Sequence, residues 1–419
     1  MSASARRVAG TIDAGGVYTS KAASAGGWIF FTASALDARG RLAEKARPSA
    51  PYELSEPARS RAQTRYFMEE LRDLLATLGS SLTDLVQLEQ YASRKTHVDP
   101  YFKVALGAGM VDKEKPTAAT AQTGELLPEG AALSVAGIAI APDPAKGWTK
   151  EYPGADPEKT ATRQFSDIVA VGPYAFTTYF PTDQVTGIDP AVRTQDWNWR
   201  GSEIGSEATF GVKTLGEKMA LAGATPADLV HYTLYLADPA DLYEFDLAWK
   251  AGFGDKAPAR TVIPAKGFAV PRREGAFGHA EGALRMELQA RFLRPGKGAT
   301  KQIVEGPGGG FGYQSAGVKA GGLLWISSQY APMAALGDAA READAIFGQL
   351  AEVARSGGAD LSGALRVRAI VKRAADAGAV YGALKKAVPK DPPAVTILVA
   401  AQLPVPAASL TIDAVVHAE

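Results

Sequence analysis

Residues 323–329, LLWISSQ, form a short apolar run directly after Gly322, a pattern typical of a buried strand. The same pattern occurs twice earlier in the chain, as WIFFTAS after Gly27 and as PYAFTTY after Gly172. Each copy precedes a stretch with apolar residues at three- and four-residue spacing, which predicts an amphipathic helix. The three helices are expected over 63–79, 207–223 and 342–358, with left-handed caps at Gly79, Gly223 and Gly357.

The sequence downstream of each helix repeats in the same way. A strand pattern comes first, then a second helical pattern, then a proline-led segment with two apolar or β-branched strands. The second helices are expected over 98–109, 239–254 and 376–388. Each repeat therefore reads β-β-α-β-α-β-β, an α+β unit with helices on one face of a mixed sheet. Joins rich in proline and glycine divide the chain into 1–148, 149–297 and 298–419, each close to the usual size of a domain.

The composition limits the chemistry that the chain can carry. Its 419 residues include 45 Lys+Arg, 45 Asp+Glu, 4 His and no Cys. The balanced charge removes the electrostatic case for nucleic-acid binding, and the absence of cysteine excludes disulfides, thiolate metal sites and a cysteine nucleophile. We expect no metal and no cofactor. No apolar run of about 18 residues indicates a membrane span, and the first residues lack the pattern of a signal peptide. A cytoplasmic protein without membrane partners is therefore expected.

The repeated unit resembles the RidA/YjgF family of imine and enamine deaminases. Residues 312–329, GYQSAGVKAGGLLWISSQ, are similar to the family's opening turn and T-S-G-Q strand, and residues 258–261, PART, match its P-A-R-[ST] motif. Leu-Pro pairs at 127–128 and 403–404 stand where the family has one before its last strand. The resemblance covers nearly the whole chain, three times over. It implies a monomeric pseudo-trimer with a barrel-like sheet core, helices outside, and ligand clefts between adjacent repeats; further self-association is left open.

The resemblance also implies roles for particular residues. In the family, the arginine of P-A-R anchors a substrate carboxylate, a task that suits its planar fork, and a glutamate on the last strand orients water. Only the second repeat has both groups, as Arg260 and Glu287. The first repeat is expected to place Ala119 and Ala136 at these positions, and the third Val395 and Asp413. The resemblance thus predicts one working cleft, at the second repeat. There a small imine or enamine bearing a carboxylate would be hydrolysed to a carbonyl product and ammonia.

Further substrate-binding residues follow from the same comparison. Thr177 is expected at the cleft serine of T-S-G-Q, with Thr178 at the motif's glycine. The expected counterparts of Thr177 are Thr32 and Ser327. Asp246 stands where the family often has an asparagine on the second helix. The aromatic residue of an opening turn should cover Arg260 from a neighbouring repeat, and the candidates are Tyr18 and Tyr313.

The second repeat departs from the other two in length. It has extra residues between Arg260 and Glu287, and they include His279, a side chain that titrates near neutral pH. We expect a substrate-specific rim there, with His279 in contact with the substrate. Two other functions stay open. One is a non-catalytic protein that binds small carboxylates, and the other is a hydrolase that reuses this fold with different residues, as chorismatases do.

Overall fold

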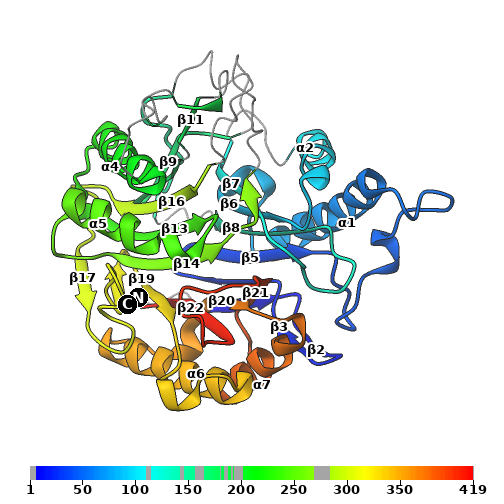
Figure 1. Ribbon diagram of the computed structural model, residues 1–419. Helices are drawn as coiled ribbons and strands as arrows, with labels where there is room; N and C mark the ends of the chain where they lie inside the picture. Colours follow the sequence, from blue (N-terminus) through cyan, green and yellow to red (C-terminus); the bar gives the residue numbers. More distant parts are fainter. Residues whose placement is uncertain are drawn as a thin grey trace.

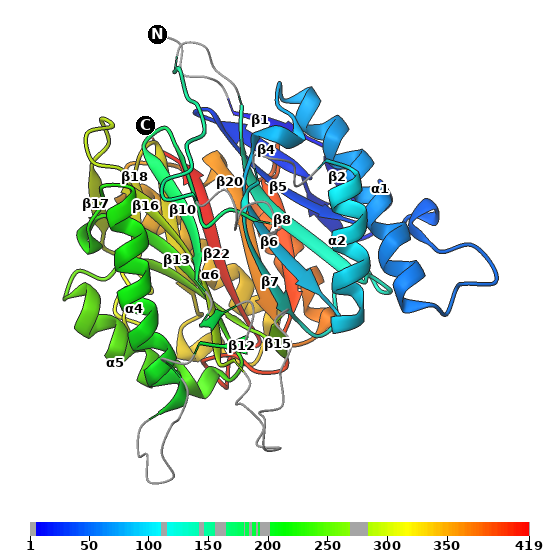
Figure 2. The same ribbon diagram turned by 90° about the horizontal axis from the view of Figure 1, so that it is seen from above.

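The computed structural model describes residues 6–109, 115–141, 146–155, 165–179, 181–183, 187–189, 192, 202–268 and 284–418. These residues form three principal sheets, of seven, five and six strands. A pair of long helices lies on the outer side of each sheet, so that the helices surround the strands (Figures 1 and 2). The α+β class predicted from the sequence is confirmed.

Three units follow one another along the chain, and we name them the first, second and third unit. The first contains β4 (Ala22–Ala25), β5 (Trp28–Ser34), α1 (Glu56–Thr77), β6 (Leu85–Ala92), α2 (Val98–Gly107), β7 (Thr117–Gln122) and β8 (Leu133–Ile140). The second contains β9 (Ile168–Val171), β10 (Tyr174–Tyr179), α4 (Glu203–Leu221), β13 (Leu229–Leu236), α5 (Leu242–Phe253), β14 (Ala259–Pro264) and β16 (Met286–Leu293). The third contains β18 (Gly317–Ala320), β19 (Leu323–Gln329), α6 (Ala339–Ser356), β20 (Ala364–Val371), α7 (Ala377–Ala387), β21 (Ala394–Val399) and β22 (Leu410–His417).

The strand order is the same in all three sheets. It runs β4-β5-β8-β6-β7 in the first unit, β9-β10-β16-β13-β14 in the second and β18-β19-β22-β20-β21 in the third. The last pair in each order is parallel and the other pairs are antiparallel. Short strands extend or flank these sheets: β1 (Arg7–Ala9), β2 (Ile12–Ala14), β3 (Val17–Thr19), β11 (Thr182–Asp183), β12 (Gly187–Ile188), β15 (Gly267–Phe268) and β17 (Lys301–Val304). The predicted β-β-α-β-α-β-β unit is therefore observed three times, while the exact domain boundaries stay a prediction.

Polar caps determine where the first helix of each unit begins. Ser55 Oγ accepts a hydrogen bond from Ala58 N at 3.3 Å, and Ser202 Oγ accepts one from Gly205 N at 3.1 Å. Asp338 caps α6 in the same way, through Ala340 N and Arg341 N. Because these side chains satisfy amide groups that lack a partner within the helix, the helices start several residues earlier than the apolar spacing alone predicts.

The apolar residues form two kinds of core. Each helix pair packs on the outer face of its own sheet, as Phe245 and Trp249 of α5 pack with Tyr232 and Leu288 of the second sheet. The inner faces of the three sheets meet in shared clusters, in which Trp28, Tyr174 and Trp325 of the three units lie together. The units are therefore held by common apolar layers, and burial of this surface is the main source of their cohesion.

A buried charge cluster also joins the three units. Glu89 of β6 pairs with Arg291 of β16 at 2.7 Å, and with Arg366 and Arg368 of β20 at 3.0 and 2.8 Å. Asp413 of β22 pairs with Arg368 at 2.8 Å. Burial alone would raise the pKa of Glu89, but the surrounding guanidinium groups outweigh it and hold that pKa below its ordinary value. Each sheet thus contributes at least one charged side chain to the cluster.

The helices of the described residues do not provide a membrane span. None of them combines the length and the apolar character that crossing a bilayer requires.

Candidate functional site

One hydrogen bond recurs at all three contacts between neighbouring units. Ser20 N donates to Pro393 O at 2.9 Å, Ser166 N to Pro116 O at 3.0 Å, and Ser315 N to Pro258 O at 3.0 Å. In each case the opening turn of one unit meets the proline that leads the parallel edge strand of another. We name the three contacts by the residue two positions after that proline: the Val395 junction, the Ala118 junction and the Arg260 junction.

The Arg260 junction joins the second and third units and is closed. Arg260 is 0% exposed, and its guanidinium donates to Asp246 Oδ1, to Gln314 Oε1 at 3.3 Å and to Phe311 O at 2.9 Å. The other carboxylate oxygen of Asp246 accepts from Tyr313 N at 2.9 Å. These contacts engage every nitrogen of the Arg260 fork, so a substrate carboxylate would have to displace Asp246 or the loop.

The loop before Tyr313 seals this ion pair tightly. A Cβ atom added at Gly312, whose φ is +59°, would lie 2.2 Å from Asp246 Oδ2 and 2.9 Å from Arg260 Nη2. Burial raises the pKa of Asp246, against the opposing effect of the Arg260 charge. Because the two charges neutralise each other where Arg260 is fully buried and Asp246 largely so, the pair fits a structural role as it stands.

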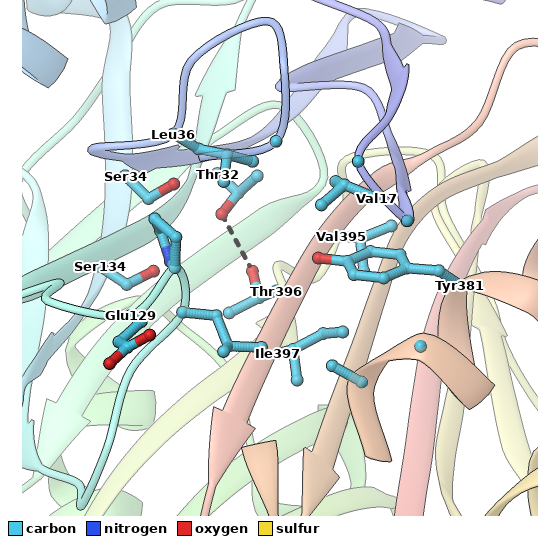
Figure 3. Close-up of a pocket in the computed structure, with 17 residues that line it drawn as sticks. Val17, Thr32, Ser34, Leu36, Glu129, Ser134, Tyr381, Val395, Thr396 and Ile397 are labelled. Atoms are coloured by element: carbon cyan, nitrogen blue, oxygen red, sulfur yellow. Dashed lines mark hydrogen bonds between the residues drawn. The ribbon is translucent and has the colours of Figure 1, made fainter. Parts of the chain in front are cut away.

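The Val395 junction joins the third and first units and is open. A cavity of about 330 Å³ lies between β5, β8, β21 and α7, and Figure 3 shows the side chains that line it. Thr32, Ser34, Ser134 and Thr396 bring hydroxyl groups to it, and Thr396 Oγ1 donates to Thr32 Oγ1 at 3.4 Å. Val17, Leu36, Val395 and Ile397 add apolar walls, and Tyr381 of α7 lies opposite the serines. No lysine, arginine or histidine belongs to the described lining.

The Ala118 junction joins the first and second units, and it holds Glu287. This side chain is 2% exposed and accepts a hydrogen bond from the backbone of Thr120 on β7. Within the described part of the chain, Glu287 Oε2 has no hydrogen-bond partner, and neither has Thr178 Oγ1 on the neighbouring strand. Burial raises the pKa of Glu287 to about 8, and among the described residues no cation opposes this shift. A carboxyl group of this kind exchanges protons near neutral pH.

Strand register shows that Glu287 and Thr178 occupy, in the second unit, strand positions whose counterparts in the first unit line the cavity at the Val395 junction. In the second sheet Tyr235 pairs with Glu287, and in the first sheet Tyr91 pairs with Ser134, which lines the cavity. Thr178 corresponds in the same way to Thr32. The residue before Thr178 pairs with the first residue of β9, and the residue before Thr32 pairs with the first residue of β4. The two unpartnered polar atoms therefore point into the contact between the first and second units.

The expected pair of Arg260 and Glu287 is not brought together. Arg260 pairs in register with Tyr232, whose ring packs against α5 on the outer face of the sheet. Glu287 pairs with Tyr235, which belongs to an inner cluster. Paired strand residues project to the same side, so Arg260 and Glu287 project from opposite faces and belong to different junctions.

The register also corrects three expected counterparts, while Val395 does take the position of Arg260. Ala118, not Ala119, takes the position of Arg260, since Leu88 pairs with Ala118 as Tyr232 pairs with Arg260. Ser134 and Thr411, not Ala136 and Asp413, take the position of Glu287. A slip of one or two residues in a uniformly apolar strand caused these errors, because sequence pattern gives no register there.

The remaining predicted residues are spread over the junctions. Tyr313 lies at the Arg260 junction, where its hydroxyl donates to Gly254 O at 2.6 Å. Tyr18 lies at the Val395 junction and donates to Val388 O at 2.8 Å. The register makes Thr177 the counterpart of Phe31 and Ile326, and not of Thr32 and Ser327 as expected. Thr177 faces the helix side of its sheet, where its hydroxyl group donates a hydrogen bond to Asp167 O at 2.7 Å. His279 lies outside the described residues.

Asp246 was predicted as a site residue, but its pairing with Arg260 was not, and the sequence of the second helices contains a signal for it. The fifth residue of the second helix is Asp246 in α5, Tyr381 in α7 and Phe102 in α2. The type of each residue matches the residue at the edge-strand position of the same unit. The acid Asp246 accompanies Arg260, whereas the aromatic residues Tyr381 and Phe102 accompany Val395 and Ala118. Comparing the three helices position by position would have shown that Asp246 is the partner of Arg260.

Comparison with known proteins gives structural likeness at low identity. No protein-family model matches the chain, and no curated protein sequence matches it. Among solved structures, a chorismatase matches 80% of this chain and 93% of its own, with 13% identity and a TM-score of 0.49. A YjgF-family protein from Mycobacterium tuberculosis covers 28% of this chain and 99% of its own, with 20% identity and a TM-score of 0.26. RidA from the Antarctic bacterium Psychrobacter sp. PAMC 21119 covers 28% of this chain and 98% of its own, with 16% identity and a TM-score of 0.25. The chain is thus similar to these proteins in part of its structure. The sequence identities and TM-scores are too low to support a statement about its activity.

Proposed function

We propose that the chain is an enzyme that hydrolyses the C–N bond of a small imine, with Glu287 as its acid–base group. The observation that carries the proposal is the state of this carboxyl group. Glu287 is buried, no cation of the described residues lies beside it, one of its oxygens has no described partner, and its pKa is raised to about 8. A carboxyl group that is largely neutral at pH 7 can donate a proton and then take one back.

The reaction needs only proton transfers and one water molecule. Glu287 gives its proton to the imine nitrogen, which makes the carbon more electrophilic. Water then forms a C–O bond at that carbon while the Glu287 carboxylate takes one of the water's protons. The resulting carbinolamine receives this proton on nitrogen, the C–N bond breaks, and the remaining hydroxyl proton returns to Glu287. Imine and water thus become a carbonyl compound and ammonia, and Glu287 ends as it began.

Thr178 supports this role from the neighbouring strand. Its unpartnered Oγ1 lies on the same face as Glu287, because Thr178 pairs with Gln289 and Glu287 is two residues away on the same strand. A hydroxyl group donates and accepts at once, so it suits the placing of a water molecule beside the carboxyl group. The proposal gives Arg260 no substrate contact, since its donors are engaged at another junction.

The test compares two buried glutamates. Glu207 of α4 also has a pKa raised to about 8 by burial, but both of its oxygens accept hydrogen bonds from Arg285 N, and Oε2 also from Met286 N. Imines with a carboxylate would be generated in place from amino acids by an amino-acid oxidase, and imines without one from amines by an amine oxidase. Their hydrolysis would be followed by ammonia release. We expect Glu287→Gln to lower kcat by roughly 10²- to 10⁴-fold, with Glu207→Gln within about threefold of wild type. Wild-type protein that accelerates no imine, or equal rates for Glu287→Gln and wild type, would contradict the proposal.

A further inference from the structure

The cavity at the Val395 junction is the strongest feature that the proposed reaction does not use. It lies between the third and first units, whereas Glu287 lies between the first and second. Its volume of about 330 Å³ is at the lower end of the range for small-molecule sites. Two different units supply its walls, so its shape depends on the folded assembly of the whole chain.

The charge of the lining distinguishes this cavity from a carboxylate site. Val395 stands in the register position that Arg260 has in the second unit, and Tyr381 stands at the position of Asp246. The charged pair of one junction is thus replaced by two uncharged side chains. The single acidic residue of the described lining, Glu129, is exposed at the rim, where it disfavours anions.

Three hydroxyl groups of the cavity lie together on one side. Thr32, Ser34 and Ser134 lie across from Tyr381 in Figure 3, and the apolar side chains of Val17 and Val395 lie beside the Tyr381 ring. A hydroxyl group both donates and accepts, so this side matches an alcohol or a primary amide. The apolar side chains and the Tyr381 ring match a flat ring. The site therefore combines a wall for a ring with a polar side of hydroxyl groups, where Glu129 is the single charged residue of the described lining.

We propose that the Val395 junction binds a small uncharged ring compound bearing an amide or hydroxyl group, and that it excludes the corresponding carboxylate. Burial of the ring supplies most of the affinity, at about 25 cal/mol per Å² of apolar surface. Exclusion of the carboxylate follows from desolvation, because an anion would lose its water without gaining a cation. This site is independent of Glu287 and of imine hydrolysis.

Two glycines of α7 provide a matched pair of variants for the test. Gly378 lines the cavity, whereas Gly382, one turn later on the same helix, is not among the lining residues. A Cβ atom at either position would meet nothing within 4 Å. Gly378→Leu should therefore fill the mouth of the cavity while the fold is kept, and Gly382→Leu should leave the cavity open.

The experiment titrates benzamide and benzoate, which share one shape and differ in charge, into the full chain by calorimetry. We expect benzamide to bind wild type with a Kd of about 1 mM or tighter, and benzoate at least tenfold more weakly. Gly378→Leu should weaken benzamide binding at least tenfold, and Gly382→Leu should change it less than twofold. Val395→Arg should reverse the preference in favour of benzoate.

Undetectable benzamide binding, equal affinity for the two compounds, or equal effects of the two glycine variants would overturn the proposal. Glu287→Gln should not affect either titration, which separates this site from the proposed reaction.

Discussion

Arg260 and Glu287 project from opposite faces of the second sheet, three register positions apart along β13. The first is neutralised by Asp246 against the third unit, and the second is buried against the first unit. Two residues that the sequence suggests as one catalytic pair therefore belong to different junctions. The consequence is a division of roles, with Arg260 as a structural ion pair and Glu287 as the candidate acid–base group.

Removal of Arg260 should affect folding before it affects substrate binding. Arg260→Ala leaves Asp246 buried without its partner, and such a loss typically costs about 3–5 kcal/mol. We expect a lower urea midpoint with an unchanged m-value, and Arg260→Lys should fall between alanine and wild type. Wild-type stability combined with a raised KM in Arg260→Ala would restore the carboxylate-anchoring role to this residue.

Neutralising Asp246 should make Arg260 available to an external anion. In Asp246→Asn the guanidinium keeps its contacts with Gln314 and Phe311 but loses its buried counter-ion. Benzoate should then bind at least tenfold more tightly than it binds to wild type, measured by calorimetry. The double variant Asp246→Asn/Arg260→Met is the control, and it should lose this gain. Benzoate binding that is the same in all three proteins would show that the junction is closed by packing rather than by charge.

Glu287 should make the stability of the chain depend on pH. Its pKa is about 8 in the folded state against an ordinary value of 4.5, so the folded state binds more protons between these values. Wild-type stability should therefore fall as pH rises through this window. Glu287→Gln lacks the titrating group and should gain a few kcal/mol relative to wild type between pH 5 and pH 8. Parallel stability curves for the two proteins would mean that Glu287 is ionised in the fold.

Glu89 should be essential to the association of the three units. Glu89→Gln removes the carboxylate that three buried arginines share, and we expect a loss of about 3–5 kcal/mol in urea unfolding. Glu217 of α4 is a matched control, because it is exposed and lies 3.9 Å from Lys213. Glu217→Gln should change stability by less than about 0.5 kcal/mol. If Glu89→Gln and Glu217→Gln changed the free energy of unfolding by similar amounts, the association of the units would depend on apolar burial alone.

The repeated fold could be predicted from sequence because its signals are local. Apolar spacing and proline-led strands recur in each unit, and the second helices lie where they were expected. The ends of the helices were predicted less accurately than the helices themselves. The left-handed residue after α6 is Gly358, with φ +70°, and not Gly357. Gly357 N still donates to Val353 O at 3.0 Å, so the helix continues one residue further than the first of two adjacent glycines suggests.

The candidate site could be predicted only in part, because it depends on register and on contacts between units. Glu287 and Thr178 were named from motif similarity, but their shared junction follows from the pairing of β10 with β16. A bulge in β13 between Leu229 and His231 shifts the pairing with β16, and equivalent bulges occur in β6 and β20. Sequence pattern does not reveal such shifts, and each one moves side chains to the other face.

The pH dependence of kcat for imine hydrolysis tests the central claim most directly. If neutral Glu287 donates the first proton, log kcat should be level below pH 8 and should fall with a slope of −1 above it, since the pKa of Glu287 is about 8. Glu207→Gln should show the same profile, which assigns the transition to Glu287 and not to the other glutamate with a raised pKa. A kcat that rises through pH 4 to 5 and stays level up to pH 10 would contradict the account, because it would require an ordinary, ionised carboxylate as the base.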